Sequence, residues 1–278
     1  MLFLIATPIG HLADITFRAV ETLQRCSYIL CEDTRHSRHL LDHYNIKTPL
    51  KSFHKFNESK KESEIIEDLK EGKEVALISD AGMPLICDPG AKLVEACRDH
   101  DIAISVIPGP SACISALALT GWFSECFQFV GFLPKGEALL KKTLSTLLHY
   151  PGTSIAYETP QRLVKTLAIL KSLDPSRRVA VARELTKTYE ECKVASAENL
   201  HLFYVEHPPR GEIVLLIHQE IKQPPVINEA AIIQQVKTLA HDLQIPLSDA
   251  IRRVALETGI SRKKIYTITH LALDDVDC

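Results

Sequence analysis

The chain has 278 residues, of which 46% are hydrophobic, and a formal net charge of −3 at pH 7. This length predicts two compact units, or two with a small third, each with a core of its own. The slightly acidic balance excludes a polybasic coat on nucleic acid, so any RNA contact must come from local basic patches.

The eight cysteines show neither a CxxC pair nor a Cys/His zinc spacing, and no metal site is predicted. Cys26, Cys31 and Cys113 lie in apolar context, which is typical of reduced, buried thiols in the cytosol. The opening residues, MLFLIATPIG, lack the basic region and the cleavage site of a secretory signal. These patterns predict a soluble cytoplasmic protein.

The first part of the chain alternates between short apolar runs and amphipathic segments. Strands are expected at residues 2–6, 27–31, 50–53, 74–79 and 102–107. The clearest helix covers residues 59–71, where Ile65, Ile66 and Leu69 share one face. Such alternation predicts a mostly parallel sheet with helices on both faces.

Residues 102–124 carry no charge and are long enough to span a bilayer. However, Pro108-Gly109-Pro110 and Gly121 interrupt them. A buried strand, a tight turn and a buried helix are therefore predicted in place of a membrane span.

A second α/β lobe is expected after this segment. Strands are predicted at residues 153–157, 178–183 and 212–217, with a two-strand excursion near residues 189–195. A polar, proline-bearing linker at 218–228 precedes an all-helical tail. The predicted fold is thus two α/β lobes, residues 1–113 and 114–222, followed by a helical domain at residues 223–278.

Three loops at strand ends have a common composition. They read ATPIG (6–10), SDAGMP (79–84) and PGPSA (108–112), and each places Gly or Pro beside a small residue. Loops at the carboxyl ends of strands are where open α/β sheets hold ligands, and Ser111 is predicted to cap the next helix. The loops predict a backbone-lined pocket for a small polar molecule, with three ordinary connections as the alternative.

Known nucleotide-binding loops do not occur in the chain. It contains no GxGxxG, and Glu137 follows the one GxxxxG where a phosphate-binding loop requires Lys. A dinucleotide enzyme, a P-loop NTPase and a glycine-rich Rossmann methyltransferase are therefore disfavoured.

Eight motifs occur in an order that resembles the tetrapyrrole-methylase superfamily of S-adenosylmethionine enzymes, across essentially the whole chain. They read LFLIATPIGHLADIT, CEDTRHSRHLL, SDAGMPLICDPG, IPGPSA, GFLPKG, YETPQRL, ARELTK and RGEIVLLI. The resemblance is strongest to members that methylate the 2′-hydroxyl of a cytidine in the decoding region of small-subunit (16S) rRNA. Met83, His11 and Phe56 depart from the pattern, where Thr, Asn and a second His are usual.

The resemblance implies a homodimer that binds S-adenosylmethionine in a cleft between the two lobes. The residues that it implies for cofactor binding in the first lobe are Pro8, Asp80, Ala81, Gly82, Met83, Ser111 and Ala112. Those that it implies in the second lobe are Tyr157, Leu185 and Gly211.

Methylation of a ribose hydroxyl needs a group that accepts its proton or orients it. Asp33 or Glu184 is the candidate for this role, with Arg35 and Lys187 holding phosphate. Ion pairs between lobes or subunits are an equally weighted alternative for all four residues.

The tail carries a separate signal for RNA. Residues 247–273 are expected to form helix, short turn and helix, with Ala255 and Gly259 spaced as in helix-turn-helix units. A basic cluster with a local charge of +4 is predicted to bind rRNA phosphates, in naked rRNA or in the assembled subunit; its five basic residues are Arg252, Arg253, Arg262, Lys263 and Lys264. A helical cap with a solvated face is the alternative for the tail.

Two other functions remain open for the whole chain. One is a small-molecule methylase of the tetrapyrrole or diphthine type, which shares the fold. The other is a non-catalytic module that binds RNA or a nucleotide.

Overall fold

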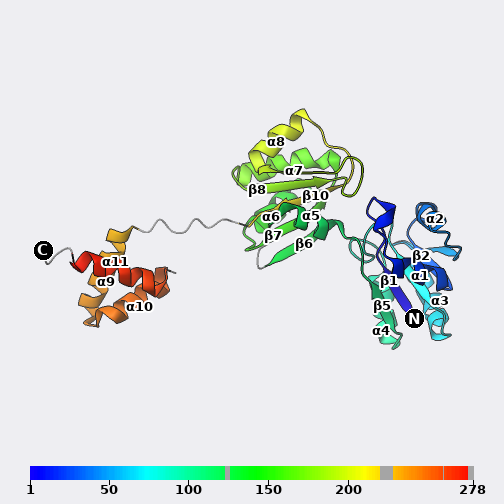
Figure 1. The fold of residues 1–278 in the computed structure, drawn as a ribbon, viewed down its shortest axis with the longest axis horizontal. Helices are drawn as coiled ribbons and strands as arrows, with labels where there is room; N and C mark the ends of the chain where they lie inside the picture. The colour runs from blue at the N-terminus through cyan, green and yellow to red at the C-terminus, as the bar shows by residue number, and fades with distance from the viewer. Residues whose placement is uncertain (123–125, 220–227, 259, 275–278) are drawn as a thin grey trace. The chain divides into compact units, whose positions relative to one another are not determined.

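The computed structural model describes residues 1–122, 126–219, 228–258 and 260–274. The chain divides into two compact units, Met1–Glu220 and Ile221–Cys278. The first unit contains both predicted α/β lobes, each built on its own five-stranded sheet (Figure 1). The predicted boundary at residues 113/114 falls inside helix α5 (Ala112–Thr120).

The first lobe is a parallel sheet, as predicted, and its strands follow the order β3-β2-β4-β1-β5. All five expected strands are present: β1 (Leu2–Ile5), β2 (Tyr28–Cys31), β3 (Leu50–Ser52), β4 (Val75–Ile78) and β5 (Ile104–Ile107). A short 3-10 helix and four α-helices connect them: η1 (Leu12–Asp14), α1 (Phe17–Arg25), α2 (Thr34–His43), α3 (Glu58–Lys70) and α4 (Ala91–Asp99).

The pleat of the central strand explains why both faces of this sheet are apolar. Val75 and Leu77 of β4 point to one face, where they pack with α3 and α4, while Ala76 and Ile78 pack on the other face with α1 and α2. The predicted apolar stripe of α3, including Ile65, is buried in the first of these cores. Burial on both faces accounts for the continuous apolar runs in the sequence.

The second lobe has a mixed sheet in the order β6-β7-β10-β8-β9. Its strands are β6 (Phe127–Phe132), β7 (Thr153–Glu158), β8 (Arg178–Arg183), β9 (Glu191–Ser196) and β10 (Ile213–Ile217). Helices α6 (Glu137–Leu148), α7 (Pro160–Leu173) and α8 (Ala197–Glu206) cover one face, and α5 packs on the other. The three strands predicted for this lobe are confirmed.

Two predictions about these segments are wrong, and one strand was not predicted. The excursion near residues 189–195 is one strand, β9, which pairs antiparallel with β8 as a hairpin. The segment 102–122 is only partly buried, because β5 is an edge strand and α5 exposes Ile114 and Leu119. Strand β6 was not predicted; it lies at the other sheet's edge and exposes Phe127 and Phe132, so it lacks a continuous buried run.

The second unit is a bundle of three helices, α9 (Glu229–Leu243), α10 (Leu247–Thr258) and α11 (Arg262–Asp274). Its small core combines Ile232 and Val236 of α9 with Ile251 and Val254 of α10 and Ile265 of α11. The helical tail is thus confirmed, although Gly259 lies outside the described residues. None of the helices that the structure describes is long and apolar enough to cross a membrane.

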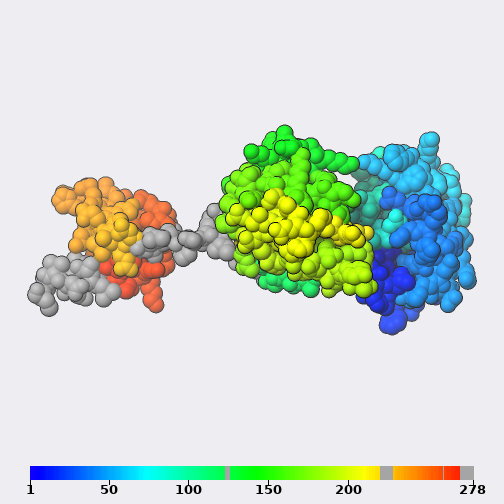
Figure 2. All heavy atoms as spheres, turned by 90° about the horizontal axis from the view of Figure 1, so that it is seen from above, coloured from blue at the N-terminus to red at the C-terminus, as the bar shows by residue number. Residues whose placement is uncertain are grey.

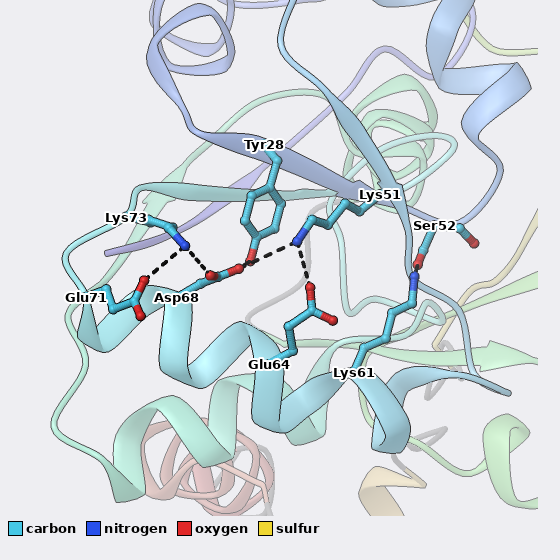
Figure 3. Close-up of polar contacts among 8 residues, drawn as sticks. All are labelled: Tyr28, Lys51, Ser52, Lys61, Glu64, Asp68, Glu71 and Lys73. Atoms are coloured by element: carbon cyan, nitrogen blue, oxygen red, sulfur yellow. Dashed lines mark hydrogen bonds and ion pairs between the residues drawn. The ribbon is translucent and has the colours of Figure 1, made fainter.

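A polar network attaches α3 to the first sheet (Figure 3). Asp68 accepts a 2.8 Å hydrogen bond from the hydroxyl of Tyr28, which is 5% exposed, and forms ion pairs with Lys73 and Lys51. Hydrogen bonds from Lys73 and from Tyr28 lower the pKa of Asp68. Asp68 therefore joins the helix to β2, to β3 and to the chain just before β4.

We expect Asp68→Ala to lower the free energy of unfolding by about 2–3 kcal/mol, because it leaves the buried Tyr28 hydroxyl and Lys73 without this partner. Glu71→Ala is the matched control, since Glu71 pairs with the same Lys73 but its side chain is 66% exposed; about 0.5 kcal/mol is expected. Urea unfolding of both variants measures the difference. Equal losses would contradict the role given to Asp68.

Candidate active site

A cavity of about 440 Å³ lies between the two lobes of the first unit, and we call it the inter-lobe cavity. From the first lobe it is lined by the loops that follow β1, β2, β4 and β5, through Ile9, Glu32, residues 80–83 and 86–88, and Ser111. From the second lobe it is lined around Tyr157, Leu185 and residues 211–214. The three glycine- or proline-bearing loops therefore meet at one site.

The loop after β4 is fastened to the loop after β1. Thr7 and Gly82 exchange two backbone hydrogen bonds of 2.9 and 3.0 Å, and the Thr7 hydroxyl donates to the carbonyl of Ser79. Gly82 has a φ of +78°, a conformation that glycine adopts without a steric penalty. This turn holds Ala81, Gly82 and Met83 at the cavity wall.

The far end of the same loop is anchored on α3. The backbone N–H of Gly90, which precedes α4, donates to the buried carboxylate of Glu58 at 3.1 Å. Gly90 has a φ of +125°, and a side chain there would collide with Leu77. These contacts explain why an apolar strand is followed by so many turn residues.

Five carboxylates line the cavity, and two of them, Glu158 and Glu212, are paired with Arg162 and Lys187. No ion pair among the described residues involves the other three, which are those of Glu32, Asp80 and Asp88. Burial, and after it the charges of Glu32 and Asp80, raise the pKa of Asp88 to about 6. The cavity thus holds three carboxylates that no cation among the described residues pairs with, which favours a positively charged ligand.

The wall on the side of the second lobe depends on Glu184. Its carboxylate accepts hydrogen bonds of 3.0 Å from the backbone N–H of Glu212 and from Lys187. Gly211 packs so closely on this carboxylate that a side chain there would overlap it. The backbone of Leu185 and that of Gly211 are therefore held side by side at the cavity.

All the residues predicted to bind the cofactor line this cavity except Pro8, whose place is taken by its neighbour Ile9. Ser111 precedes α5, but its side chain does not cap the helix as predicted; its hydroxyl lies 3.2 Å from the sulfur of Cys113. Among the three departures from the family pattern only Met83 lines the cavity, while His11 caps η1 and Phe56 is exposed.

The four residues predicted to be catalytic do not line the inter-lobe cavity. Asp33 caps α2 and pairs with Arg35 at 3.0 Å, and hydrogen bonds from Arg35 lower the pKa of Asp33 to about 2. Glu184 pairs with Lys187 at 3.0 Å. The pKa of Glu184 is lowered by the hydrogen bond from the Glu212 backbone and, to a smaller extent, by that from Lys187. Both pairs lie within a single lobe, so they are not the pairs between lobes or subunits that were the alternative. The catalytic roles of the four residues stay predictions.

Several residues that line the cavity were not predicted to bind the cofactor. They are Glu32, Ile86, Cys87, Asp88, Phe132, Glu158, Thr159, Pro160, Glu212, Ile213 and Val214. A usable signal existed for Asp88, which stands in the same turn-rich loop as Asp80, and for Glu32, which directly follows β2. Phe132 had no such signal, because strand β6 was not predicted.

Comparison with known proteins identifies the family. Residues 1–201 match the model of tetrapyrrole (corrin/porphyrin) methylases. The chain belongs to the tetrapyrrole methylase family. As a tetrapyrrole methylase it is a methyltransferase that uses S-adenosylmethionine.

Curated relatives of this tetrapyrrole methylase extend over nearly its whole length. A protein of Halalkalibacterium halodurans named ribosomal RNA small subunit methyltransferase I is 38% identical over 274 residues, covering 97% of this chain and 94% of the relative. The protein of that name from Haemophilus influenzae is 40% identical over 270 residues, covering 96% and 95%.

Solved structures show the same fold at low sequence identity. The methyltransferase CobJ aligns with a TM-score of 0.60 and 19% identity, covering 79% of this chain and 94% of that chain. Diphthine synthase aligns with a TM-score of 0.58 and 14% identity, covering 79% and 89%.

The inter-lobe cavity of this tetrapyrrole methylase fits S-adenosylmethionine. Its volume lies in the range of small-molecule sites. The uncompensated carboxylates Glu32, Asp80 and Asp88 suit a ligand that carries a sulfonium and an ammonium group, while Ile9 and Tyr157 supply apolar surface.

We expect the free energy of unfolding to depend on pH through the titration of Asp88. Its pKa is about 6 in the folded chain and about 4 in an unfolded one. The contribution of this carboxyl group to the free energy of unfolding is therefore fully present below pH 4 and is lost as the pH rises through 6. Asp88→Asn should therefore be more stable than the wild type at pH 8, by about 1–2 kcal/mol after allowance for partial exposure. The advantage should shrink toward pH 4.

Urea unfolding between pH 4 and 8 measures this difference. Asp33→Asn is the control of opposite sign, because the pKa of Asp33 is lowered to about 2 and its contribution is present above pH 4. A stability difference for Asp88→Asn that does not change with pH would contradict the assignment.

Proposed function

We propose that this methyltransferase transfers a methyl group from S-adenosylmethionine to the 2′-hydroxyl of a cytidine in the decoding region of small-subunit rRNA. The observation that carries the proposal is the similarity to proteins named ribosomal RNA small subunit methyltransferase I. That similarity covers 97% of the chain for the relative from H. halodurans and so continues well past the family model at residue 201. We place the reaction in the cytoplasm.

Two alternatives are less well supported. A methylase for tetrapyrroles or diphthine shares the fold and the family model, but CobJ and diphthine synthase are only 19% and 14% identical to this chain. A non-catalytic RNA-binding module would not need the carboxylate-rich inter-lobe cavity.

The chemistry of the proposal rests on side chains around the inter-lobe cavity. When bound, S-adenosylmethionine supplies an electrophilic methyl group on a positively charged sulfur. Asp88 is the carboxylate best suited to accept the proton of the ribose hydroxyl, because it lines the cavity and its pKa of about 6 is close to neutral pH. Orientation of the hydroxyl by the surrounding loops would supply much of the rate.

The pairs Asp33–Arg35 and Glu184–Lys187 have a different part in the proposal. Both carboxylates have a lowered pKa and are already hydrogen-bonded, which makes them weaker proton acceptors than Asp88. Arg35 has an exposed side chain and is suited to hold phosphate, as the sequence predicts.

The second unit is proposed to bind rRNA phosphates. Its five predicted RNA-binding residues are all exposed, and none forms an ion pair with the described residues; they are Arg252, Arg253, Arg262, Lys263 and Lys264. A Thermotoga maritima protein of the same name as the other relatives is 42% identical, and 97% of it is covered by 78% of this chain. About a fifth of this chain thus lies outside that alignment. We assign the tail to RNA affinity and not to catalysis, because its basic residues lie in a different unit from the inter-lobe cavity.

We also propose that the protein is a homodimer. Exposed apolar side chains gather within residues 106–132, on the edge strands of both sheets and on α5; they are Val106, Ile114, Leu119, Phe127, Val130 and Phe132. Such a surface is typical of a site that another protein covers. Phe132 also lines the inter-lobe cavity, which would connect dimerisation to the active site.

The substrate is tested by transfer of labelled methyl to small ribosomal subunits that lack the modification, with ribose-methyl mapping of the product. Label on one decoding-region cytidine is expected. Absence of label with intact cofactor binding would exclude this substrate and leave small-molecule acceptors.

The same assay tests the proton acceptor. Asp88→Asn should lower kcat by about 100-fold or more, because it removes the group that accepts the proton, whereas Asp33→Ala and Glu184→Ala should lower kcat less. The reverse ranking would return the role to Asp33 or Glu184.

Replacing the five basic residues of the tail by Gln should weaken binding to small-subunit rRNA and leave the affinity for the cofactor unchanged. The slope of log affinity against log salt should fall by about 3.5, since each of the five phosphate contacts contributes roughly 0.7 to the slope. The matched control neutralises five exposed cations of the first lobe, namely Arg18, Lys60, Lys70, Lys92 and Arg98. A similar slope for both variants would refute the assignment.

Dimerisation is tested by the mass of the full chain from light scattering after size exclusion. Leu119→Asp should convert a dimer into a monomer, because it places a charge in the apolar surface. Leu202→Asp on α8 is the control, since Leu202 is equally exposed but lies outside residues 106–132. A wild type that is already monomeric would exclude the dimer.

A further inference from the structure

A second cavity, of about 500 Å³, lies on the second lobe, and we call it the α8 cavity. It is formed by α8, the loop between β8 and β9 and the segment 207–210 that follows the helix. Figure 2 shows α8, in yellow, at the surface of the first unit. None of the residues that line this cavity also lines the inter-lobe cavity.

Aromatic groups dominate the α8 cavity. The rings of Phe203 and His207 stack with centroids 4.6 Å apart and planes inclined by 16°, and Lys193 lies over the Phe203 ring at 4.2 Å. Tyr189 is 72% exposed, although it is a large apolar side chain at the cavity wall. Flat aromatic surfaces of this kind bind the faces of other planar rings.

A polar group at the cavity has no hydrogen-bond partner among the described residues. Tyr204 lines the cavity and is only 2% exposed, and its hydroxyl forms no hydrogen bond with the described residues. A buried hydroxyl without a partner costs free energy, and Tyr204→Phe would relieve it without changing the ring. The hydroxyl has almost no accessible surface, so the unmet hydrogen bond is a cost built into the cavity wall.

The charges of the cavity leave one cation available. The carboxylate of Glu191 is paired with Arg183 at 2.8 Å and with Lys193 at 3.3 Å, and that of Glu184 is paired with Lys187. Arg210 is exposed and forms no ion pair with the residues that the structure describes. Its guanidinium is thus available to an anion, for which phosphate is the best geometric match.

The α8 cavity and the inter-lobe cavity share a wall. Glu184 and Arg210 line the α8 cavity, while the next residue in each case, Leu185 and Gly211, lines the inter-lobe cavity. The hydrogen bonds of the Glu184 carboxylate hold this wall together. Only the backbone of residues 184–185 and 210–211 would therefore separate a ligand in the α8 cavity from the proposed site of methyl transfer.

We propose that the α8 cavity binds an unstacked nucleobase of the RNA substrate, with its phosphate on Arg210. The inference rests on the proposed rRNA substrate and deepens it. Tyr189 supplies the exposed stacking surface, and the pair Phe203–His207 forms the inner aromatic wall. A base held here would fix a nucleotide near the target and so position the ribose that reacts.

The first test is binding of the full-length protein to a fluorescein-labelled octamer of cytidylate and to an abasic ribose-phosphate octamer of the same length. Stacking on one aromatic side chain contributes about 1–3 kcal/mol. Tyr189→Ala should thus weaken binding of the cytidylate octamer roughly tenfold, and Tyr189→Phe should restore it. Neither variant should change binding of the abasic octamer.

Two further variants separate phosphate from base. Arg210→Ala should weaken binding of both octamers and reduce the salt slope by about 0.7. Leu202→Ala, an exposed position of α8 outside the cavity, is the control and should change nothing. Unchanged cytidylate binding by Tyr189→Ala, equal losses with both octamers, or no base-dependent binding by the wild type would each overturn the inference.

Methyl transfer to small ribosomal subunits distinguishes this inference from the proposed function. If the wild type transfers methyl, Tyr189→Ala should raise KM for the subunit roughly tenfold with little change in kcat. A wild-type KM for that variant would overturn the nucleobase site while the proposed function stands. A wild type that transfers no methyl would refute the proposed function, whereas base-dependent binding of the octamer would still support the cavity.

Discussion

The parallel pairing of β1 with β4 on one side and β5 on the other is the constraint on which the active site depends. In this register Leu4 lies opposite both Leu77 and Val106, so the three strands end at the same level. Their loops leave from one edge of the sheet, as in other open α/β sheets that hold ligands there. The bridge between Thr7 and Gly82 extends the alignment beyond the strands and closes the cavity wall.

Carboxylates near this edge fall into two groups with different environments. Asp88 lies in the inter-lobe cavity beside Glu32 and Asp80, and burial raises its pKa to about 6. Asp33 and Glu184 are hydrogen-bonded to cations or backbone N–H groups, which lower their pKa. The same functional group thus serves as a poised acid–base candidate in one place and as a structural anchor in another. Glu184 acts as such an anchor for the wall between the two cavities of the first unit.

The sequence predicted strands well where burial on both faces leaves a continuous apolar run, as in β4. It failed at β6, where exposed Phe127 and Phe132 alternate with partly buried residues at a sheet edge. It also failed to separate Asp33 from Asp88 as site residues. Both follow an apolar strand, and only the course of each loop decides whether the carboxylate caps a helix or lines a cavity.

The sequence by itself determined the strand–loop–helix alternation, the family and most of the loops that line the inter-lobe cavity. These features are local, because they depend on apolar runs, turn residues and motif order along the chain. The tertiary structure alone decided which charged groups are paired and which are not, that Glu184 supports a wall, and that aromatic residues of α8 form a second cavity beside the first. These features depend on contacts between distant segments, such as Lys187 with Glu212, and no spacing along the chain encodes such a contact.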